Sequence, residues 1–373
     1  MTMRTEIVGT SSRLAEVGPA WDDLWRRSSQ SVFQSHGWIA AWLSSRQAGD
    51  RARLCVGLCW MNDRLVAAMP LVIRRHRGVR VLEWAAKDCS DYCDAIVDPD
   101  LQNGRSALEM VWAAVVAAGG FDIAYLSHVR PNAAAGGLFS GRLSSMALKP
   151  GHRSARSLQV ESHGANGHGW FRSLNKKARN NHTRGLRIIG ETGPIAIKTS
   201  EPGQFDEAVL DRMIALKQEW LVATQQNNDI LHNDALILRA LVKELARQRV
   251  LRVFSIHCGG ALVAGSVNIV SGMHMQAFFA AYDPTYDRAS PGTLVMVEYI
   301  TWAFDNGVAQ VDFLCGEEEY KFKFANAQTD LVSFMGARTL IGKVALALGE
   351  RLDRGRQPEK LAELIPSGKL IEA

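Results

Sequence analysis

Apolar and polar positions along the first half of the chain alternate between two spacings, one typical of helices and one typical of strands. Trp21, Leu24 and Trp25 recur at a spacing that places them on one helix face, whereas later segments are short, rich in Val and Ile, and bounded by turn residues. We therefore predict helices over residues 13–28, 36–47 and 106–119, and strands over residues 53–61, 64–75, 79–86, 91–98 and 121–129.

The second half repeats this order. The pattern predicts helices over residues 168–189, 205–224, 233–248 and 290–307, strands over residues 194–200, 251–258, 261–270, 273–283, 308–316 and 329–337, and a tail helix over residues 339–354. Both halves run from two helices through a strand, a two-residue turn and a second strand to a later helix and strand. We interpret this as a tandem α/β duplication with an N-terminal domain over 1–150, a C-terminal domain over 151–340, and a helical tail over 341–373.

Composition narrows the class of protein. With 47% hydrophobic and 22% charged residues the chain is globular, and its 373 residues fit two domains. A net charge of +5 is too mild for a DNA-binding protein but suits an anionic small molecule. No apolar run reaches the roughly 18 residues of a membrane helix. The six cysteines lack the tight spacing of zinc sites, so we expect free thiols, no metal and a cytoplasmic location.

One loop followed by a helix is the strongest candidate for chemistry. Arg288, Ser290, Pro291 and Gly292 open directly into the helix that follows, with Ser290 as the expected N-cap and Pro291 at the first helical position. Free N–H groups and the positive end of the dipole bind phosphate oxygens at such a terminus. A capped helix with no ligand is the alternative.

The strand over 308–316 is expected to diverge from the strand over 273–283, which would leave a slot for an extended chain. Tyr320 and Lys321 follow at the end of the sheet where ligands of α/β proteins gather. Lys321 could stabilise negative charge on a carbonyl oxygen. Its alternative is a solvated lysine on an amphipathic segment.

The element order and the run YDPTYDRASPGTLVMVEYITWA followed by DFLCGEEEYKFKFA resemble the GNAT superfamily of acyltransferases. Within it they are similar to the tandem-domain branch, which holds FemAB-like transferases and CelD/BcsL-type acetyltransferases linked to cellulose and exopolysaccharide synthesis. The likeness extends over about residues 30–340. The loop Arg288-Ala-Ser-Pro-Gly-Thr departs from the Q/R-x-x-G-x-G/A loop of single-domain members, as is usual in the tandem branch.

The resemblance implies acyl transfer from acetyl-CoA or another acyl-CoA to an amine or hydroxyl. The slot would hold the pantetheine arm. Contacts to the cofactor would come from the loop, the helix start and the tyrosine beyond the last strand: Arg288, Ser290, Pro291, Gly292, Thr293, Leu294 and Tyr320. Tyr282 is the candidate acid, Asp283, Glu318 and Asp312 are candidate bases, and Lys321 is the candidate contact to the carbonyl or phosphate.

Two further clusters could bind the acceptor. Carboxylates interleaved with aromatic rings suit a sugar or an amine, and they occur at Trp84, Lys87, Asp91, Tyr92 and Asp94. The junction between the halves is rich in cations, including Lys176 and Arg179 on one helix face. An ordinary loop and a solvated helix face are the respective alternatives.

Three alternatives to acetyl transfer stay open at this point. The basic junction favours aminoacyl transfer from tRNA, whereas the modest net charge counts against it. Long-chain acyl transfer would need a deep apolar slot. A non-catalytic subunit of a polysaccharide synthase, in peripheral contact with a membrane complex, would have a blocked slot. The sequence settles neither the acceptor nor the length of the acyl chain.

Overall fold

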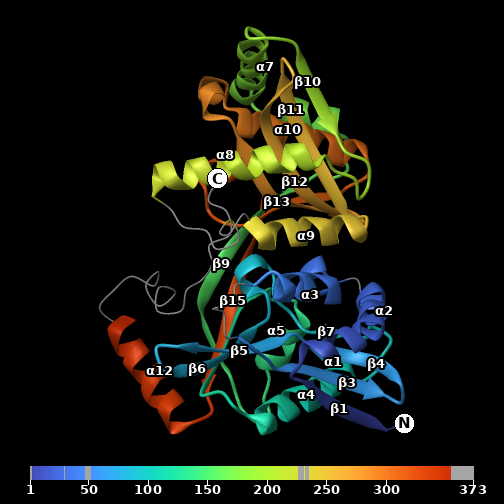
Figure 1. Ribbon diagram of the computed structural model, residues 1–373, viewed down its shortest axis with the longest axis vertical. Coiled ribbons are helices and arrows are strands. Elements are labelled where there is room, and N and C mark those ends of the chain that lie inside the picture. The colour runs from blue at the N-terminus through green and yellow to red at the C-terminus, as the bar shows by residue number, and fades with distance from the viewer. Residues whose placement is uncertain (1, 29, 47–51, 226–230, 232–234, 354–373) are drawn as a thin grey trace. The chain divides into compact units, whose positions relative to one another are not determined.

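Helices and strands alternate along the whole described chain, which confirms the predicted α/β fold class (Figure 1). The computed structural model describes residues 2–28, 30–46, 52–225, 231 and 235–353. Residues 354–373 of the predicted tail lie outside this part.

The chain divides into two units, and the first is built from two separate segments. Residues up to Ala155 join residues from Asp330 onward in the first unit, and Arg156–Thr329 form the second. This division differs from a simple split near residue 150, because the strand after Asp330 belongs with the N-terminal segment. Two long strands contribute residues to both units, β9 (Lys149–Glu161) and β15 (Ala327–Ala337).

The first unit holds a four-stranded sheet, ordered β1-β3-β4-β7, and the strands β15-β8-β6-β5-β2 of an 11-stranded sheet. The strand predicted over 64–75 is divided at Pro70, which has no N–H to donate to a sheet. The strand predicted over 91–98 shrinks to two residues. The other elements of the unit are β1 (Met3–Val8), α1 (Ser11–Glu16), α2 (Gly18–Ser28), η1 (Val32–Gln34), α3 (His36–Ser44), β2 (Arg53–Leu54), β3 (Val56–Met61), β4 (Arg64–Met69), β5 (Leu71–His76), β6 (Val79–Trp84), η2 (Lys87–Cys89), β7 (Ile96–Val97), α4 (Gly104–Ala118), β8 (Ile123–Val129), α5 (Ala134–Phe139) and α12 (Leu340–Asp353).

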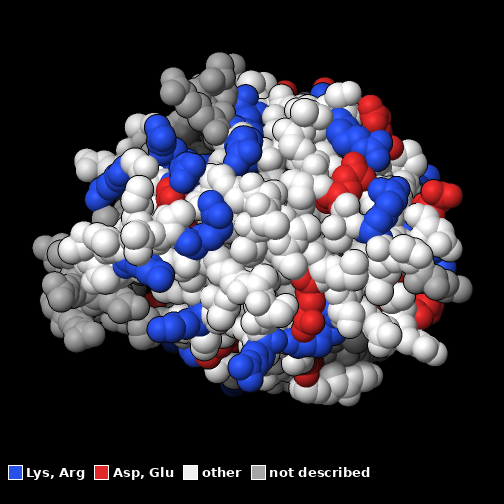
Figure 2. All heavy atoms as spheres, turned by 90° about the horizontal axis from the view of Figure 1, so that it is seen from below, with Lys and Arg blue, Asp and Glu red and all other residues white. Residues whose placement is uncertain are grey.

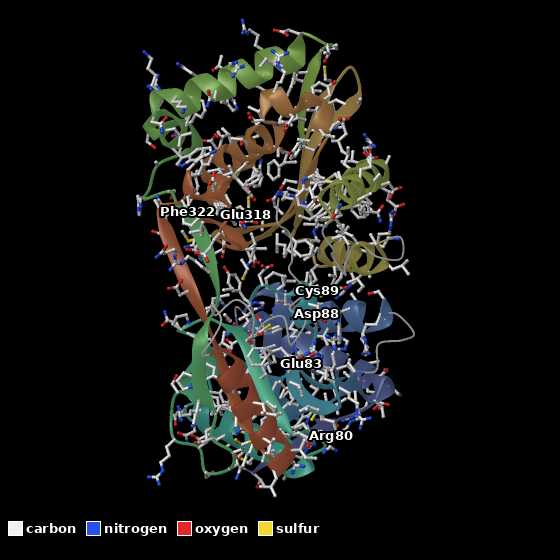
Figure 3. All side chains as sticks on the ribbon, turned by 90° about the vertical axis from the view of Figure 1, so that its left-hand side faces the viewer. Arg80, Glu83, Asp88, Cys89, Glu318 and Phe322 are labelled. Atoms are coloured by element: carbon white, nitrogen blue, oxygen red, sulfur yellow. The ribbon has the colours of Figure 1, made fainter. Side chains whose placement is uncertain are left out.

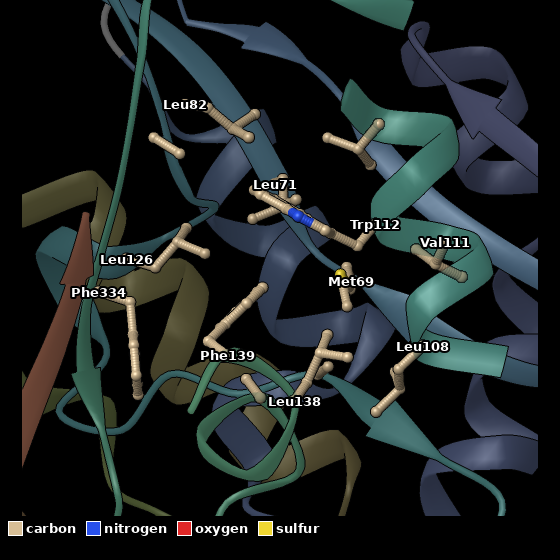
Figure 4. Close-up of a cluster of buried hydrophobic side chains, with 14 of the residues drawn as sticks. Met69, Leu71, Leu82, Leu108, Val111, Trp112, Leu126, Leu138, Phe139 and Phe334 are labelled. Carbon is tan, nitrogen blue, oxygen red and sulfur yellow. The ribbon is translucent and has the colours of Figure 1, made fainter. Parts of the chain in front are cut away.

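The core of the first unit gathers around Trp112 of α4 (Figure 4). The Trp112 ring lies edge-on to Phe139, with 5.1 Å between centroids, and Phe139 packs at 5.6 Å from Phe334 of β15. Aromatic pairs of this kind each add about 0.5–1.5 kcal/mol beyond their buried area. The late strand β15 is therefore part of this core.

The second unit contains the strands β10-β11-β12-β13-β14-β9 of the 11-stranded sheet. Met213 of α8 packs on Gly265 of β12, whereas the ring of Phe254 of β11 packs at a tilt against the ring of Tyr299 of α10, with 6.1 Å between centroids. Gly265 and Phe254 lie on opposite faces by strand alternation, so α8 and α10 cover opposite faces of the sheet. The elements are α6 (Gly167–Ser173), α7 (Lys176–Gly190), β10 (Ile195–Thr199), α8 (Glu207–Thr224), α9 (Leu236–Arg247), β11 (Leu251–Cys258), β12 (Ala261–Ser271), β13 (His274–Tyr282), η5 (Pro284–Ala289), α10 (Pro291–Asp305), β14 (Gln310–Cys315) and α11 (Glu319–Phe322).

Two departures from the predicted elements have clear causes. The helix expected over 168–189 is broken, because Leu174 is extended and Asn175 caps a new helix by accepting a 2.9 Å hydrogen bond from the N–H of Ala178. Strand β9 was not predicted, because its first half, KPGHRSA, has no apolar alternation.

The surface shows mixed charge. On the face shown in Figure 2, Lys and Arg side chains are interspersed with acidic side chains and a broad uncharged area. Among the described residues, no helix is both long enough and apolar enough to cross a membrane.

Candidate functional site

The parallel strands β13 and β14 pair over three residues and then part. Their paired positions are His274 with Gln310, Met275 with Val311, and Gln276 with Asp312. Beyond Gln276, β13 continues for six residues without pairing to β14, a length of about 20 Å. The register of β13 against β12 shifts at Phe278, which forms a bulge at the start of this opening. The expected divergence of the two strands is therefore present.

Helix α10 begins at the far end of β13. Gly292 faces the Tyr282 ring, and an added Cβ would be in ordinary contact with it, 3.4 Å from Tyr282 Cδ1. Pro291 occupies the first helical position as predicted. Ser290 occupies the N-cap position as expected, but its side chain makes no cap hydrogen bond. Its backbone is left-handed, with a φ of 54°, because its N–H closes the preceding turn onto Asp287 at 2.9 Å.

The first turn of α10 keeps one free donor in the described part of the chain. The N–H groups of Thr293 and Leu294 donate to the Ser290 carbonyl at 3.0 and 3.2 Å, whereas no partner is found there for the Gly292 N–H. Arg288 is exposed just before this turn and makes no ion pair among the described residues. An exposed guanidinium and an open helix N-terminus suit an anion.

Helix α7 packs against the loop that precedes α10. At Gly185, an added Cβ would lie 2.5 Å from the Ala289 carbonyl oxygen and 3.1 Å from the Leu294 side chain. His182 lies 2.9 Å from the Glu298 carboxylate of α10. Sequence reasoning did not single out Gly185, His182 or Glu298. A glycine inside a basic helix was the one available signal, because such a glycine often marks a close contact.

Tyr282 and the neighbouring Asp283 differ in their chemical state. Burial, then the charge and hydrogen bond of Asp287, raise the pKa of Tyr282, so its hydroxyl keeps its proton. Burial alone would raise the pKa of Asp283, but hydrogen bonds from Thr285 and the charge of Arg212 outweigh it and the pKa is lowered. Asp283 accepts from the Thr285 N–H at 2.9 Å and hydroxyl at 2.6 Å, so it caps η5.

Asp312 lies at the last paired position before β13 and β14 part. Its buried carboxylate accepts hydrogen bonds of 2.8 Å from the Ser157 hydroxyl and 2.8 Å from the Leu314 N–H. The Ser157 hydroxyl in turn accepts from the Gln159 side chain. These partners on β9 were not predicted, because β9 itself was not.

Lys321 is buried rather than solvated, so the alternative of a solvated lysine is wrong. Its Nζ lies 2.8 Å from Glu318 Oε2 and 3.1 Å from the Cys315 carbonyl oxygen. Both side chains lie against Gly316, where an added Cβ would clash with them. Glu318 immediately precedes the short helix α11, and Phe322 ends it (Figure 3). Burial, then Glu318, raise the pKa of the adjacent Tyr320, which packs against the core of the unit.

The predicted acceptor residues of the first half are all buried in the first unit. Lys87 pairs with Glu83 at 2.9 Å. Asp94 accepts from the N–H groups of Ala134 and Ala135 at 3.1 and 2.8 Å, so it caps α5. They therefore do not form an exposed loop. The remaining members of this cluster are Trp84, Asp91 and Tyr92.

The predicted cations of the junction divide between two environments. Lys176 is exposed at the start of α7 and makes no ion pair among the described residues. Arg179 instead donates to the carbonyls of Arg172, at 2.7 Å, and Leu174, where α6 ends. Its guanidinium thus joins the two helices. In the described ranges, no group of three or more His, Cys, Asp or Glu side chains could hold a metal ion.

Comparison with known protein families finds one domain that matches part of this chain. Residues 176–322 match the acetyltransferase (GNAT) domain, so the second unit carries a domain of this type. No curated protein sequence matches the chain.

Three solved structures are similar to most of the chain. FemX has a TM-score of 0.56 at 9% identity, covering 90% of this chain and 97% of that one. A C-terminal domain from Agrobacterium fabrum, described as that of a lysylphosphatidylglycerol synthetase, has a TM-score of 0.54 at 11% identity, covering 91% and 96%. A tandem GNAT protein of clavulanic acid biosynthesis has a TM-score of 0.47 at 12% identity, covering 90% and 99%. The fold is α/β, and the GNAT domain match lies within the second unit.

Proposed function

We propose that the chain transfers an acyl group from acyl-CoA to an amine or hydroxyl acceptor, and that the second unit holds the donor. The observation that carries this proposal is the opening between β13 and β14, which ends beside Tyr282 and Gly292. An extended pantetheine arm fits between strands that have parted, where its amides can bond to unpaired backbone groups.

The pyrophosphate of the donor belongs at the start of α10. The Gly292 N–H and the helix dipole favour negative charge there, and Arg288 adds a planar cation. Because Gly292 has no side chain, a phosphate can closely approach its backbone. Lys176 and other exposed cations of α7 lie on the helix that packs behind this loop.

Acyl transfer forms a bond from the acceptor nitrogen or oxygen to the acyl carbon and breaks the carbon–sulfur bond. The acceptor proton needs a base, and the leaving thiolate needs an acid. Tyr282 keeps its proton, but it lies beside Gly292 at the proposed pyrophosphate end, six residues of β13 beyond the position paired with Asp312, so we assign it to contact with the donor's phosphates rather than to the leaving thiolate. Asp312, at the point where the strands part, is the proposed base, because Asp283 caps η5 and Glu318 pairs with Lys321. Lys321 would stabilise the developing oxyanion or a phosphate.

Aminoacyl transfer is the second candidate. FemX and the synthetase domain share the fold of this chain, and the exposed cations of α7 could attract an RNA phosphate backbone. If the chain transfers an acetyl group instead, the proposed acceptor is a sugar hydroxyl of a surface polysaccharide. A non-catalytic role would require that no acyl-CoA enters the opening.

Isothermal titration with acetyl-CoA, free CoA and longer acyl-CoAs tests the proposal. We expect saturable binding that is lost in Gly292→Trp, which fills the space against Tyr282. Gly137→Trp is the matched control, because Gly137 is exposed and an added Cβ there meets nothing within 4 Å. Absence of binding by every CoA species, with the protein folded, would refute the donor assignment and favour aminoacyl transfer or a non-catalytic role.

A further inference from the structure

Helix α12 of the first unit presents its large apolar side chains to solvent. It lies at the margin of the unit beside β6 (Figure 1). Four of its side chains have between 55% and 76% of their surface exposed. At about 100° per residue, these positions fall within one arc of about 100° around the helix. We call the four residues the apolar stripe: Leu340, Ile341, Val344 and Leu348.

The side of α12 that packs on the first unit is nearly opposite the apolar stripe. Gly342 is buried, and an added Cβ there would lie 2.1 Å from the Asp122 carbonyl oxygen. Helix geometry places Gly342 about 150° from the centre of the apolar stripe. An ordinary surface helix turns its apolar face toward the core of the protein. Helix α12 is turned the other way, so the apolar stripe does not attach it to the first unit.

Polar contacts at the start of α12 fix this orientation. The Thr339 hydroxyl donates to the Asp122 carboxylate at 2.9 Å and accepts from the Gly342 N–H at 3.1 Å. The Arg338 N–H donates to the Asp122 carbonyl at 2.8 Å, and the Arg338 Nε donates to the Phe121 carbonyl at 3.1 Å. Turning α12 to bury the apolar stripe would break these bonds. The exposure of the apolar stripe is therefore built into the fold.

Cationic side chains gather at the end of α12 where the apolar stripe begins. Gly119 and Gly120 precede Phe121, and an added Cβ at these glycines would meet the guanidinium groups of Arg338 and Arg53, respectively. Asp122 is buried and pairs with Arg80 at 2.8 Å. Within residues 340–348 the one charged side chain is an exposed lysine. The cations at this end are Arg53, Arg80, Arg338 and Lys343.

The size and composition of the apolar stripe favour a lipid surface over a second protein chain. Four exposed side chains present a few hundred Å², whereas each partner of a stable protein interface buries about 800 Å². Protein interfaces also depend on Trp, Tyr and Arg anchors, and the apolar stripe has no aromatic ring. Aliphatic side chains beside cations are typical of helices that lie in a membrane interface, where the cations are attracted to anionic head groups.

We propose that α12 docks the first unit on an anionic phospholipid bilayer, with the apolar stripe between head groups and acyl chains and the four cations at the head groups. Helix α12 has 14 residues and would lie along the bilayer rather than cross it. The proposal concerns the first unit and does not depend on the acyl-CoA site of the second. Where both hold, acyl transfer takes place beside a membrane.

Sedimentation of the full chain with lipid vesicles tests this proposal. One set of vesicles contains phosphatidylcholine and phosphatidylglycerol in equal parts, and the other contains phosphatidylcholine alone. We expect saturable binding to the anionic vesicles and at least about tenfold weaker binding to the neutral ones. Raising the salt concentration should weaken binding to the anionic vesicles, because it screens the cations.

A double substitution at the centre of the apolar stripe tests the role of α12. Ile341→Gln with Val344→Gln should weaken binding to the anionic vesicles at least about tenfold. Both side chains are exposed, so the double variant should fold as the wild type does. Val222→Gln is the matched control, because Val222 is 80% exposed on α8 of the second unit and should leave vesicle binding unchanged.

Three results would overturn the proposal. The first is a wild-type chain that sediments with neither kind of vesicle. The second is equal vesicle binding by the double variant and by Val222→Gln. The third is a dimer in sedimentation equilibrium that the double variant converts to a monomer, because a second copy of this chain would then cover the apolar stripe.

Acetyl-CoA titration keeps this proposal separate from the acyl-CoA site. The double variant should bind acetyl-CoA as the wild type does, whereas Gly292→Trp should lose acetyl-CoA and keep vesicle binding. Failure of the donor assignment would therefore leave the vesicle result unchanged, and failure of the vesicle result would leave the donor assignment unchanged.

Discussion

The Ser157 hydroxyl donates a 2.8 Å hydrogen bond to the Asp312 carboxylate and thereby joins β9 to β14 where β14 leaves β13. Both side chains are buried. In Ser157→Ala, we expect Asp312 to lose a donor inside the protein and the free energy of unfolding to fall by about 1–3 kcal/mol. Urea denaturation measures this loss.

The control for this change is Ser144→Ala, because Ser144 is exposed. If Asp312 is the base, Ser157→Ala should also shift the pH–rate profile of acyl transfer, whereas Ser157→Thr should restore it. Equal stability of Ser157→Ala and Ser144→Ala would contradict the buried role of this hydrogen bond.

Lys321 offers a second test through its pair with Glu318. Lys321→Ala leaves the Glu318 carboxylate buried without its cation, and we expect a loss of about 3 kcal/mol in the free energy of unfolding. Lys323→Ala, an exposed lysine two residues away, should have little effect. If Lys321→Ala is as stable as Lys323→Ala, the ion pair does not form in solution.

Gly185 should control acyl-CoA binding without touching the ligand. An added methyl group would press on the Ala289 carbonyl oxygen and displace the loop that precedes α10. We therefore expect Gly185→Ala to weaken acetyl-CoA binding several-fold in isothermal titration. Gly190→Ala on the same helix is the control, because its Cβ would lie at an ordinary 3.5 Å from Ile195. The same affinity for both variants would show that α7 does not set the loop.

The buried carboxyl group of Asp94 should make the free energy of unfolding depend on pH. Burial, opposed by hydrogen bonds from Ala135, Ala134 and Ala95, raises the pKa of Asp94 to about 6, from an ordinary value near 3.8. Because the folded-state pKa is raised, this group stabilises the fold fully below about pH 3.8, and the contribution is lost as pH rises through about 6. The expected loss is on the order of 2–3 kcal/mol.

Denaturation of the wild type and of Asp94→Asn at several pH values between 4 and 7 measures this contribution. The change in the free energy of unfolding with pH that Asp94 causes should be absent in Asp94→Asn. It should persist in Asp100→Asn, because the side chain of Asp100 is exposed. A persisting slope in Asp94→Asn would assign it to other groups.

Local patterns predicted most elements, and they predicted the opening between β13 and β14 on the condition that the sheet follows the order of strands along the chain. The same patterns could not reveal how polar side chains are used. Asp283 and Arg179 serve as caps, and Lys321 is buried beside a carboxylate only three residues earlier. Such roles depend on which chain atoms meet in space, and Ser157 meets Asp312 from 155 residues away.

The repeat of elements in the two halves also left features of the first unit unpredicted. It predicted equivalent elements, yet Pro70 divides one strand of the first unit, and Glu83 of β6 is buried and paired with Lys87. Glutamate within the strand segment VRVLEWAA gave no signal of burial, because strand alternation allows a polar residue to face solvent.

The return of the chain to the first unit has a consequence for how the protein is made. Residues of β15 pair with β8 and place Phe334 in the first core, yet they leave the ribosome after all of the second unit. The second unit is a continuous segment that can finish folding first, whereas the β8 edge of the first unit stays open until then. The first unit therefore begins to be made first, yet it can be completed only after the whole of the second unit has been translated.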